Sequence, residues 1–345
     1  MNNKQTILKS IHLGRTERPP VMILSGGVWA NKQIGLSLQD SFDLPPEKNA
    51  GNIIRMNEKV RSDLVWAAAG CNNLALRAIG VNVTFNEVGV AARVEEPLIT
   101  TADEVDRLNV DDLENDPGII ASLETAHILK QEIGQDTLIA ISQWGPVTLA
   151  SLLLGTKGFI LMSMRNKEAA EHVLDFTEKL VIKYWSLFVQ AGAELVSQAE
   201  PSASYDMMSP KQFVSLARPR MQNTNRAVSG LVQAKMLHIC GNINKMLELL
   251  PETGSDVISF DHYVDLKLAR EVLGGKMAFA GKLDPVGAIL NGTPQQVREL
   301  TAQGIGEAGS EGGYIVMPGC DIPPASPLEN IQAMVQVARD TRYTM

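Results

Sequence analysis

The chain has 345 residues, of which 45% are hydrophobic and 20% are charged, and its formal net charge is -8 at pH 7. This composition is typical of a globular protein that buries a large core, either as two average domains or as one α/β barrel. The acidic balance argues against a nucleic-acid partner, because phosphate binding needs a basic surface. No apolar run reaches the length of a membrane span, the N-terminus lacks the apolar core of a signal peptide, and three cysteines are too few for a disulfide scaffold. We therefore expect a cytoplasmic protein with no membrane partner.

The first half of the chain shows helix and strand patterns at irregular intervals. Apolar spacing and helix-start signals predict helices over residues 6–13, 47–69, 118–133 and 166–191. Buried strands are predicted over 21–24 and 138–142, and residues 71–94 are expected to hold a strand and hairpin. The sequence from Thr101 to Glu104 is typical of a capping box at a helix start.

The second half repeats a strand–helix unit five times. Strands are predicted over 194–198, 235–239, 257–260, 277–280 and 314–317, each followed by a helix pattern. Helix starts at Ser209, Thr293 and Ser326 share a hydroxyl cap, a proline next to it and a Glu or Gln three residues after the cap. Such repetition indicates a parallel sheet.

No G-x-G-x-x-G follows the first predicted strand, and the length suits an eight-fold barrel, with a doubly wound sheet as the alternative. We therefore predict an α/β protein with a (β/α)8 TIM barrel. The chain is expected to form a single domain, residues 1–345, with a short N-terminal helical extension at about residues 1–18.

Potential ligands and acids follow the predicted strands, where a barrel gathers its active site. Taken in order, they are Gln143, Trp144, Glu200, His238, Cys240, Asp261, His262, Lys282, Asp284, Cys320 and Asp321. His238 and Cys240 are two residues apart, so on a strand both side chains leave from the same face. Together with Cys320 they offer one nitrogen and two sulfur donors, the kind of set that open three-ligand zinc sites use.

Structural alternatives exist for the same residue types. A lone cysteine is usually a small buried hydrophobe, which is the interpretation for Cys71, and Asp284 before a proline is compatible with a plain helix cap.

Five segments resemble the uroporphyrinogen decarboxylase superfamily, and two of them, H-x-C-G-N and P-G-C-D-I-P-P, are similar to its zinc-dependent methylcobamide:coenzyme M methyltransferase branch. The segments are Gly145–Leu149, Glu200–Ser204, His238–Asn242, Gly281–Pro285 and Pro318–Pro324. The resemblance implies a (β/α)8 barrel in which His238, Cys240 and Cys320 hold Zn²⁺. It also implies that Asp261 is a displaceable fourth ligand and that Glu200 belongs to the pocket wall; Gln143 and Asp284 are further candidates for cofactor contacts.

The implied chemistry is methyl transfer. Little of a free thiol is thiolate near neutral pH, whereas zinc deprotonates a bound thiol. The resemblance then implies attack on the methyl group of methylcobalamin, carried by a separate corrinoid protein, with coenzyme M or a similar thiol as acceptor.

Departures from the family leave other functions open. The loop at residues 25–31 has no arginine, although the decarboxylases use arginines there for a polycarboxylated porphyrinogen. Many methyltransferase relatives have Glu-Ala-x-x-x-Gly where this chain has Leu76–Gly80, so the front pocket differs. The alternatives are transfer from a methylated small molecule to the corrinoid, metal-free decarboxylation, and a corrinoid- or metal-binding module without turnover.

Overall fold

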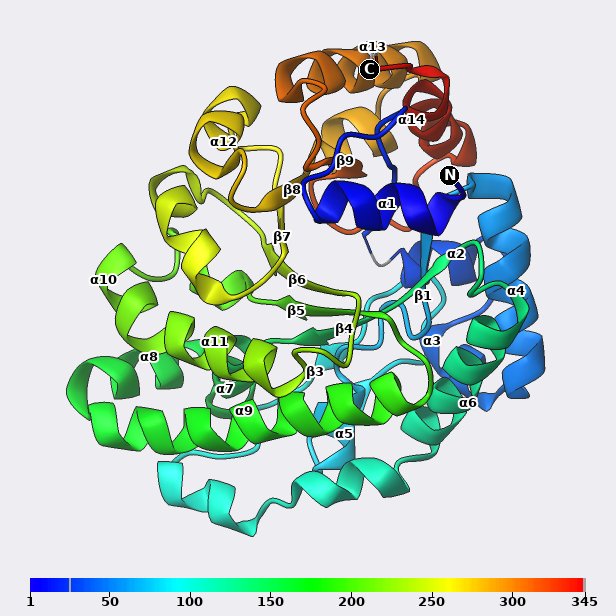
Figure 1. The fold of residues 1–345 in the computed structure, drawn as a ribbon. Helices are drawn as coiled ribbons and strands as arrows, with labels where there is room; N and C mark the ends of the chain where they lie inside the picture. The colour runs from blue at the N-terminus through cyan, green and yellow to red at the C-terminus, as the bar shows by residue number, and fades with distance from the viewer. Residues whose placement is uncertain (25, 344–345) are drawn as a thin grey trace.

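A parallel sheet forms the centre of the protein, whose computed structural model describes residues 1–24 and 26–343 (Figure 1). Within these residues, seven strands lie in the order β1-β4-β5-β6-β7-β8-β9, and all neighbouring pairs are parallel. Their bounds are β1 (Leu64–Trp66), β4 (Leu138–Trp144), β5 (Leu195–Ala199), β6 (Ala234–Ile239), β7 (Val257–Phe260), β8 (Ala278–Leu283) and β9 (Tyr314–Pro318). A separate antiparallel pair, β2 (Val83–Thr84) and β3 (Arg93–Val94), forms the hairpin expected within residues 71–94.

Helices surround the sheet, as Figure 1 shows. The first seven α-helices are α1 (Asn3–Ile11), α2 (Gly27–Lys32), α3 (Leu38–Asp43), α4 (Pro46–Val60), α5 (Leu74–Ala78), α6 (Pro117–Glu132) and α7 (Pro146–Leu154). The others are α8 (Thr156–Arg165), α9 (Lys167–Gln190), α10 (Pro210–Gln212), α11 (Arg218–Ala227), α12 (Leu266–Leu273), α13 (Pro294–Ala308) and α14 (Leu328–Asp340). Short 3-10 helices are η1 (Ala102–Arg107), η2 (Val110–Asn115), η3 (Pro201–Ala203) and η5 (Asn244–Thr253), and η4 (Phe213–Ala217) and η6 (Pro285–Leu290) are π-helical.

The barrel closes through a segment that is almost too short to be a strand. Val21 forms a parallel bridge with Val316 of β9, and the Met22 N–H donates to the Val316 carbonyl over 3.0 Å. On the other side, the Asp63 N–H donates to the Val21 carbonyl over 2.9 Å. The predicted (β/α)8 barrel is confirmed, with its first strand, expected over residues 21–24, reduced to this bridge. Ser25 lies outside the described residues.

Side chains on the strands alternate between the barrel interior and the surrounding helices. An inner cluster of apolar residues includes Leu138 and Ala140 of β4 and Met236 of β6, and Ile7 and Ile11 of α1 pack onto it. Because α1 also contacts β1, β4, β8 and β9, it covers one end of the barrel. The predicted N-terminal helix is therefore confirmed, slightly earlier than expected.

The expected helix over residues 47–69 was wrong in its second half. The helix α4 ends at Val60, and Arg61 adopts a left-handed conformation with φ 64° that stops the helix. The next residues form β1, whose side chains are all buried. A short apolar run that is buried on both faces has no periodicity that distinguishes a strand from a helix. The sequence pattern therefore predicted a helix where β1 forms.

Three of the four predicted helix starts have the expected capping contacts. Ser209 and Thr293 form capping boxes at α10 and α13, and Thr101 forms one at η1, which is a 3-10 helix. The start at Ser326 was wrong, because α14 begins at Leu328 with Pro327 in the cap position.

Among the described residues, no single helix is long and apolar enough to cross a membrane. The consecutive helices α7 and α8 meet the length and composition criteria only when taken together, and they are bent by 108° relative to each other.

A buried carboxylate ties the closing segment to the rest of the barrel. Asp63 has no exposed surface and accepts hydrogen bonds from Arg18 (2.7 and 2.8 Å), Arg339 (3.1 Å) and the Val21 N–H (2.8 Å). These donors come from the N-terminal segment, the bridge and α14, so one side chain joins both ends of the chain to the start of β1.

Asp63→Ala should lower the free energy of unfolding by about 3–5 kcal/mol, because it leaves two largely buried guanidinium groups without their counter-ion. Urea denaturation followed by circular dichroism measures this change. Glu311→Ala, which removes the exposed partner of Arg15, is the control and should leave the midpoint near the wild-type value. Equal midpoints for the two variants would show that Asp63 does not hold the barrel closed.

Candidate metal centre and adjoining cavity

One histidine and two cysteines converge at the C-terminal ends of β6 and β9. The distance from His238 Nε2 to Cys240 Sγ is 2.9 Å, that from Cys240 Sγ to Cys320 Sγ is 3.4 Å, and that from Cys320 Sγ to His238 Nε2 is 3.9 Å. A metal ion needs several His, Cys, Asp or Glu side chains with their ligand atoms close together. Within the part of the chain that the structure describes, these three residues form the one such group. The structure thus brings together the three residues that the sequence singled out.

The orientation of the His238 ring suits a metal ligand. Its Nδ1 lies 2.8 Å from the Ser259 hydroxyl oxygen, on the residue paired with it in β7. The Ser259 hydroxyl donates in turn to Met317 Sδ over 3.8 Å, so its oxygen is free to accept the Nδ1 proton. That tautomer leaves Nε2 with a lone pair directed at the two sulfur atoms, as in metal sites where a second residue orients the histidine.

The two thiols perturb each other. The hydrogen bond from Cys240, together with the nearby His238, lowers the pKa of Cys320 to about 4. The same hydrogen bond, together with burial, raises the pKa of Cys240. The pair therefore holds a thiolate readily, and a thiolate is the form of cysteine that binds metal. Two sulfur donors and one nitrogen donor fit a zinc ion.

Asp261 lies next to this group but is held by other partners. Its Oδ2 accepts the Gly241 N–H over 3.0 Å, and its Oδ1 accepts from the N–H and the Nδ1 of His262, both over 2.7 Å. The carboxylate thereby fixes the turn that follows β6. Its predicted role as a fourth metal ligand stays a prediction.

Three other predicted site residues have contacts within the fold. Gln143 is fully buried, and its side-chain oxygen accepts the Trp144 N–H over 2.6 Å. Asp284 caps η6 by accepting the N–H groups of Val286 and Gly287, both over 2.9 Å. Neither Gln143 nor Asp284 nor Glu200 lines the cavity beside the cysteines. Their predicted contacts with a cofactor stay predictions.

Glu200 is fully buried and caps α7. Its carboxylate accepts the N–H groups of Val147 (3.0 Å) and Thr148 (2.8 Å) and the Thr148 hydroxyl (2.7 Å). Burial raises the pKa of Glu200 to about 7, and these hydrogen bonds oppose the rise. A carboxylate at a helix N-terminus satisfies donors that have no partner within the helix.

A cavity of about 310 Å³ adjoins the metal-centre residues. Its apolar wall includes Leu24, Val28, Ala91, Ala92, Ala199 and Pro201, and its polar wall includes Asn72, Asn73, Ser142, Trp144 and Asp321. The sequence had indicated Trp144 and Asp321 but missed Ser142, Asn72 and Asn73. The alternation of β4 contained a signal for Ser142, because Ser142 and Trp144 share one face of the strand.

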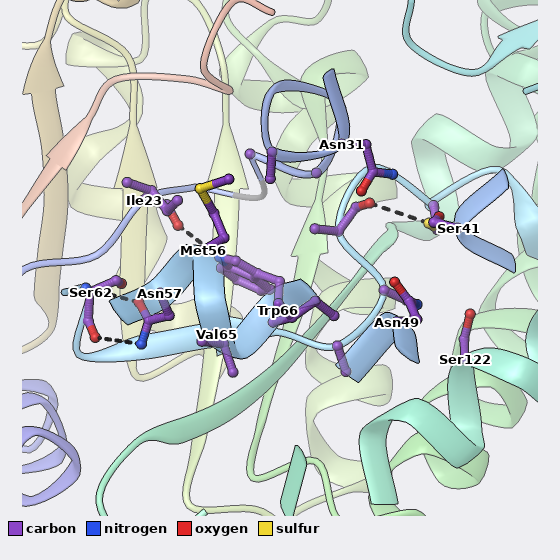
Figure 2. Close-up of a pocket in the computed structure, with 18 of the residues that line it drawn as sticks. Ile23, Asn31, Ser41, Asn49, Met56, Asn57, Ser62, Val65, Trp66 and Ser122 are labelled. Carbon is purple, nitrogen blue, oxygen red and sulfur yellow. Dashed lines mark hydrogen bonds between the residues drawn. The ribbon is translucent and has the colours of Figure 1, made fainter. Parts of the chain in front are cut away.

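A second cavity, of about 80 Å³, lies around β1 and α4 (Figure 2). The Trp66 Nε1–H donates to the Ile23 carbonyl over 2.7 Å, and Asn57 hydrogen-bonds to the backbone of Ser62. Its wall contains the remaining cysteine, Cys71, whose pKa is raised by burial. None of the three metal-centre residues lines this cavity, so the candidate site is the larger one at the strand ends.

Fold and site together define a (β/α)8-barrel protein with a nitrogen- and sulfur-lined centre at the C-terminal ends of its strands. The family model for uroporphyrinogen decarboxylase (URO-D) matches residues 2–341, so the chain belongs to this family.

Several relatives carry methyltransferase names. The methylcobamide:CoM methyltransferase MtaA of Methanosarcina barkeri is 33% identical over 227 residues, which is 65% of this chain and 64% of that protein. The methylcobamide:CoM methyltransferase MtbA of Methanosarcina mazei is 31% identical over 68% of this chain and 70% of that protein. A solved methyltransferase structure from Methanosarcina mazei has a TM-score of 0.89 at 25% identity and covers 99% of both chains. The match to MtaA thus spans just under two thirds of that relative's length.

Glu200→Ala should lower the free energy of unfolding by about 2–4 kcal/mol, because it removes the cap of α7 and leaves a void. Glu200→Gln keeps one acceptor oxygen and should lose about half as much. Chemical denaturation measures both, with Glu329→Ala, an exposed carboxylate in the first turn of α14, as a control that should change little. Unchanged stability in Glu200→Ala would contradict the capping role. Glu200 would then again be a candidate for contact with a ligand.

Proposed function

We propose that this protein is a zinc-dependent corrinoid methyltransferase that moves a methyl group between a methylated corrinoid and a small thiol. The observation that carries the proposal is the convergence of His238, Cys240 and Cys320 beside a cavity at the barrel mouth. The names of the relatives MtaA and MtbA support the same reaction class. The corrinoid partner would be a carrier protein that presents its cofactor to this mouth, and residues 1–345 would act as one domain.

The residues of the centre have distinct roles in this proposal. His238, Cys240 and Cys320 would hold the ion, with His238 kept in its ligand tautomer by Ser259. Zinc bound there would lower the pKa of a substrate thiol and so supply a nucleophile at neutral pH. Asp261 would keep the turn after β6 in place through Gly241, which preserves the position of Cys240.

The cavity would orient the substrate and exclude water. Leu24, Val28 and Trp144 form a largely apolar wall beside the sulfur ligands, so that a thiolate entering the cavity loses hydration and becomes a stronger nucleophile. In the transfer, the carbon–cobalt bond of the methylcorrinoid breaks with its electron pair left on cobalt, giving cob(I)alamin. The new carbon–sulfur bond forms to the thiol, whose proton has passed to solvent.

Decarboxylation, the reaction for which the family is named, is not favoured by the cavity. A polycarboxylated substrate needs basic side chains, and none of the described residues that line the cavity is Lys or Arg. The reverse direction, with the methyl group passed from a small molecule to the corrinoid, would use the same centre and differs only in the substrate supplied.

Cys320→Ser should lose most of the bound zinc, because a hydroxyl replaces one of the two sulfur donors. Zinc content of the purified protein by mass spectrometry checks this first step. The second measurement is the visible spectrum of methylcobalamin incubated with a small thiol under anaerobic conditions. Wild-type protein should convert methylcobalamin to cob(I)alamin, and the variant should be at least about a hundredfold slower.

Cys71→Ser is the matched control, because Cys71 is buried elsewhere and donates to the Ala69 carbonyl. Its zinc content and rate should equal those of the wild type. Full zinc content in Cys320→Ser, or a zinc-loaded wild-type protein that leaves methylcobalamin intact with every thiol tested, would overturn the proposal.

A further inference from the structure

The backbone at the end of β8 has a conformation that few side chains adopt. Lys282 has a φ of 97°, and Leu13 and Arg61 are the other described residues with a positive φ that are not glycine. Gly281 has a φ of 126°, and a Cβ atom there would lie 2.1 Å from the Phe260 carbonyl oxygen of β7. Glycine adopts such a conformation easily, whereas a lysine is strained in it. Strained residues of this kind cluster at functional sites.

The ammonium group of Lys282 holds the loop that follows β7. Its Nζ donates to the carbonyls of His262 and Val264, both over 3.2 Å, so one cation bridges two peptide groups of the same loop. Hydrogen bonds from a charged donor are stronger than those between neutral groups. The strained backbone of Lys282 is thus coupled to the position of the residues after β7.

The end of β7 supports two residues of the candidate metal centre. The Ser259 hydroxyl lies 2.8 Å from His238 Nδ1 and orients the ring. Asp261 Oδ2 accepts the N–H of Gly241, the residue after Cys240, over 3.0 Å. A shift of this segment would therefore move a nitrogen donor and a sulfur donor together.

The backbone after β7 also packs against the turn that carries Cys320. A Cβ atom at Gly319 would lie 2.5 Å from the His262 nitrogen and 3.0 Å from the Asp261 carbonyl carbon. Because the two segments are in such close contact, one cannot shift without displacing the other. The backbone after β7 therefore touches the chain beside each of the two cysteines.

We propose that Lys282 is a positioning residue of the metal centre: its strained backbone places its ammonium group on the loop after β7, and this loop fixes the positions of Cys240 and Cys320. The inference rests on the proposed zinc site and adds to it a residue that does not touch the ion. Groups beyond the ligands commonly set the affinity of a metal site. Removing the ammonium should loosen the centre even where the replacement also removes the backbone strain.

Lys282→Gly and Lys282→Ala both remove the ammonium, but only glycine suits the backbone at this position. Zinc-loaded wild-type protein and both variants are mixed with an excess of a chromogenic chelator, and the absorbance of the chelator complex gives the rate of zinc release. Both variants should release zinc about tenfold faster than the wild type. Lys282→Arg, which keeps a cation with several donors, should release zinc at close to the wild-type rate.

Thermal unfolding of the same zinc-loaded proteins separates positioning from a general loss of stability. Both variants lose the two hydrogen bonds, but Lys282→Ala keeps the backbone strain and Lys282→Gly removes it. Lys282→Gly should therefore have a Tm about 2 °C or more above that of Lys282→Ala. At an ordinary strand position the order would be reversed, because glycine is less stabilising than alanine there.

Arg61→Gly is the matched control. Arg61 also combines a cationic side chain with a positive φ, of 64°, but it ends α4 and precedes β1, at the opposite end of the barrel from the metal centre. This variant should release zinc at the wild-type rate.

The possible results separate the positioning role from the zinc site itself. The positioning role is overturned if Lys282→Gly and Lys282→Ala release zinc at the wild-type rate, if Lys282→Arg releases it as fast as Lys282→Ala, or if Arg61→Gly accelerates release equally. A Tm of Lys282→Gly below that of Lys282→Ala would overturn the claim of strain. In each of these cases the zinc site stands. If the wild-type protein binds no zinc, the proposed function fails and the inference fails with it.

Discussion

The alternation of side chains along β6 is the constraint on which the candidate site depends. Because residues two apart leave a strand on the same side, His238 and Cys240 both face the barrel interior. In the parallel sheet the ends of β6 and β9 lie at the same end of the barrel, and the distance from Cys240 Sγ to Cys320 Sγ is 3.4 Å. The same alternation on β7 directs Ser259 toward His238 and Asp261 toward the turn after Cys240. The ends of β6 and β9 therefore supply the ligands, and β7, the neighbour of β6, supplies the groups that orient them.

Barrel closure is the second requirement, since the strand ends meet only if the sheet curls fully. The closing segment contributes a single bridge at Val21, and much of its attachment passes through the buried carboxylate of Asp63. Leu24, two residues after Met22, and Val28 of α2 line the cavity beside the cysteines. The segment that closes the barrel is thus close in sequence to one wall of this cavity.

Much of this architecture could be predicted from the sequence, because its signals are local. Repeated strand–helix units predicted the parallel sheet, and the position of His238, Cys240 and Cys320 at predicted strand ends indicated that they converge. The strand β1 could not be separated from the preceding helix, since it is apolar on both faces. The place of Asn72 in the wall could not be predicted either, because it lies in a turn before α5, where no periodic pattern indicates the direction of a side chain.

Glu200 shows a different limit. It follows a strand, as Cys240 and Cys320 do, but its side chain points away from the barrel interior and caps α7. Position at a strand end therefore selects candidates, and the direction of the side chain decides their role.

The account depends most on a metal ion held by one nitrogen and two sulfur atoms of the protein. X-ray absorption at the zinc edge of the purified wild-type protein measures this shell directly. The account predicts two sulfur neighbours at about 2.3 Å and a histidine nitrogen at about 2.0–2.1 Å, with one sulfur lost in Cys240→Ser. A shell made only of oxygen and nitrogen, or one that Cys240→Ser leaves unchanged, would contradict it.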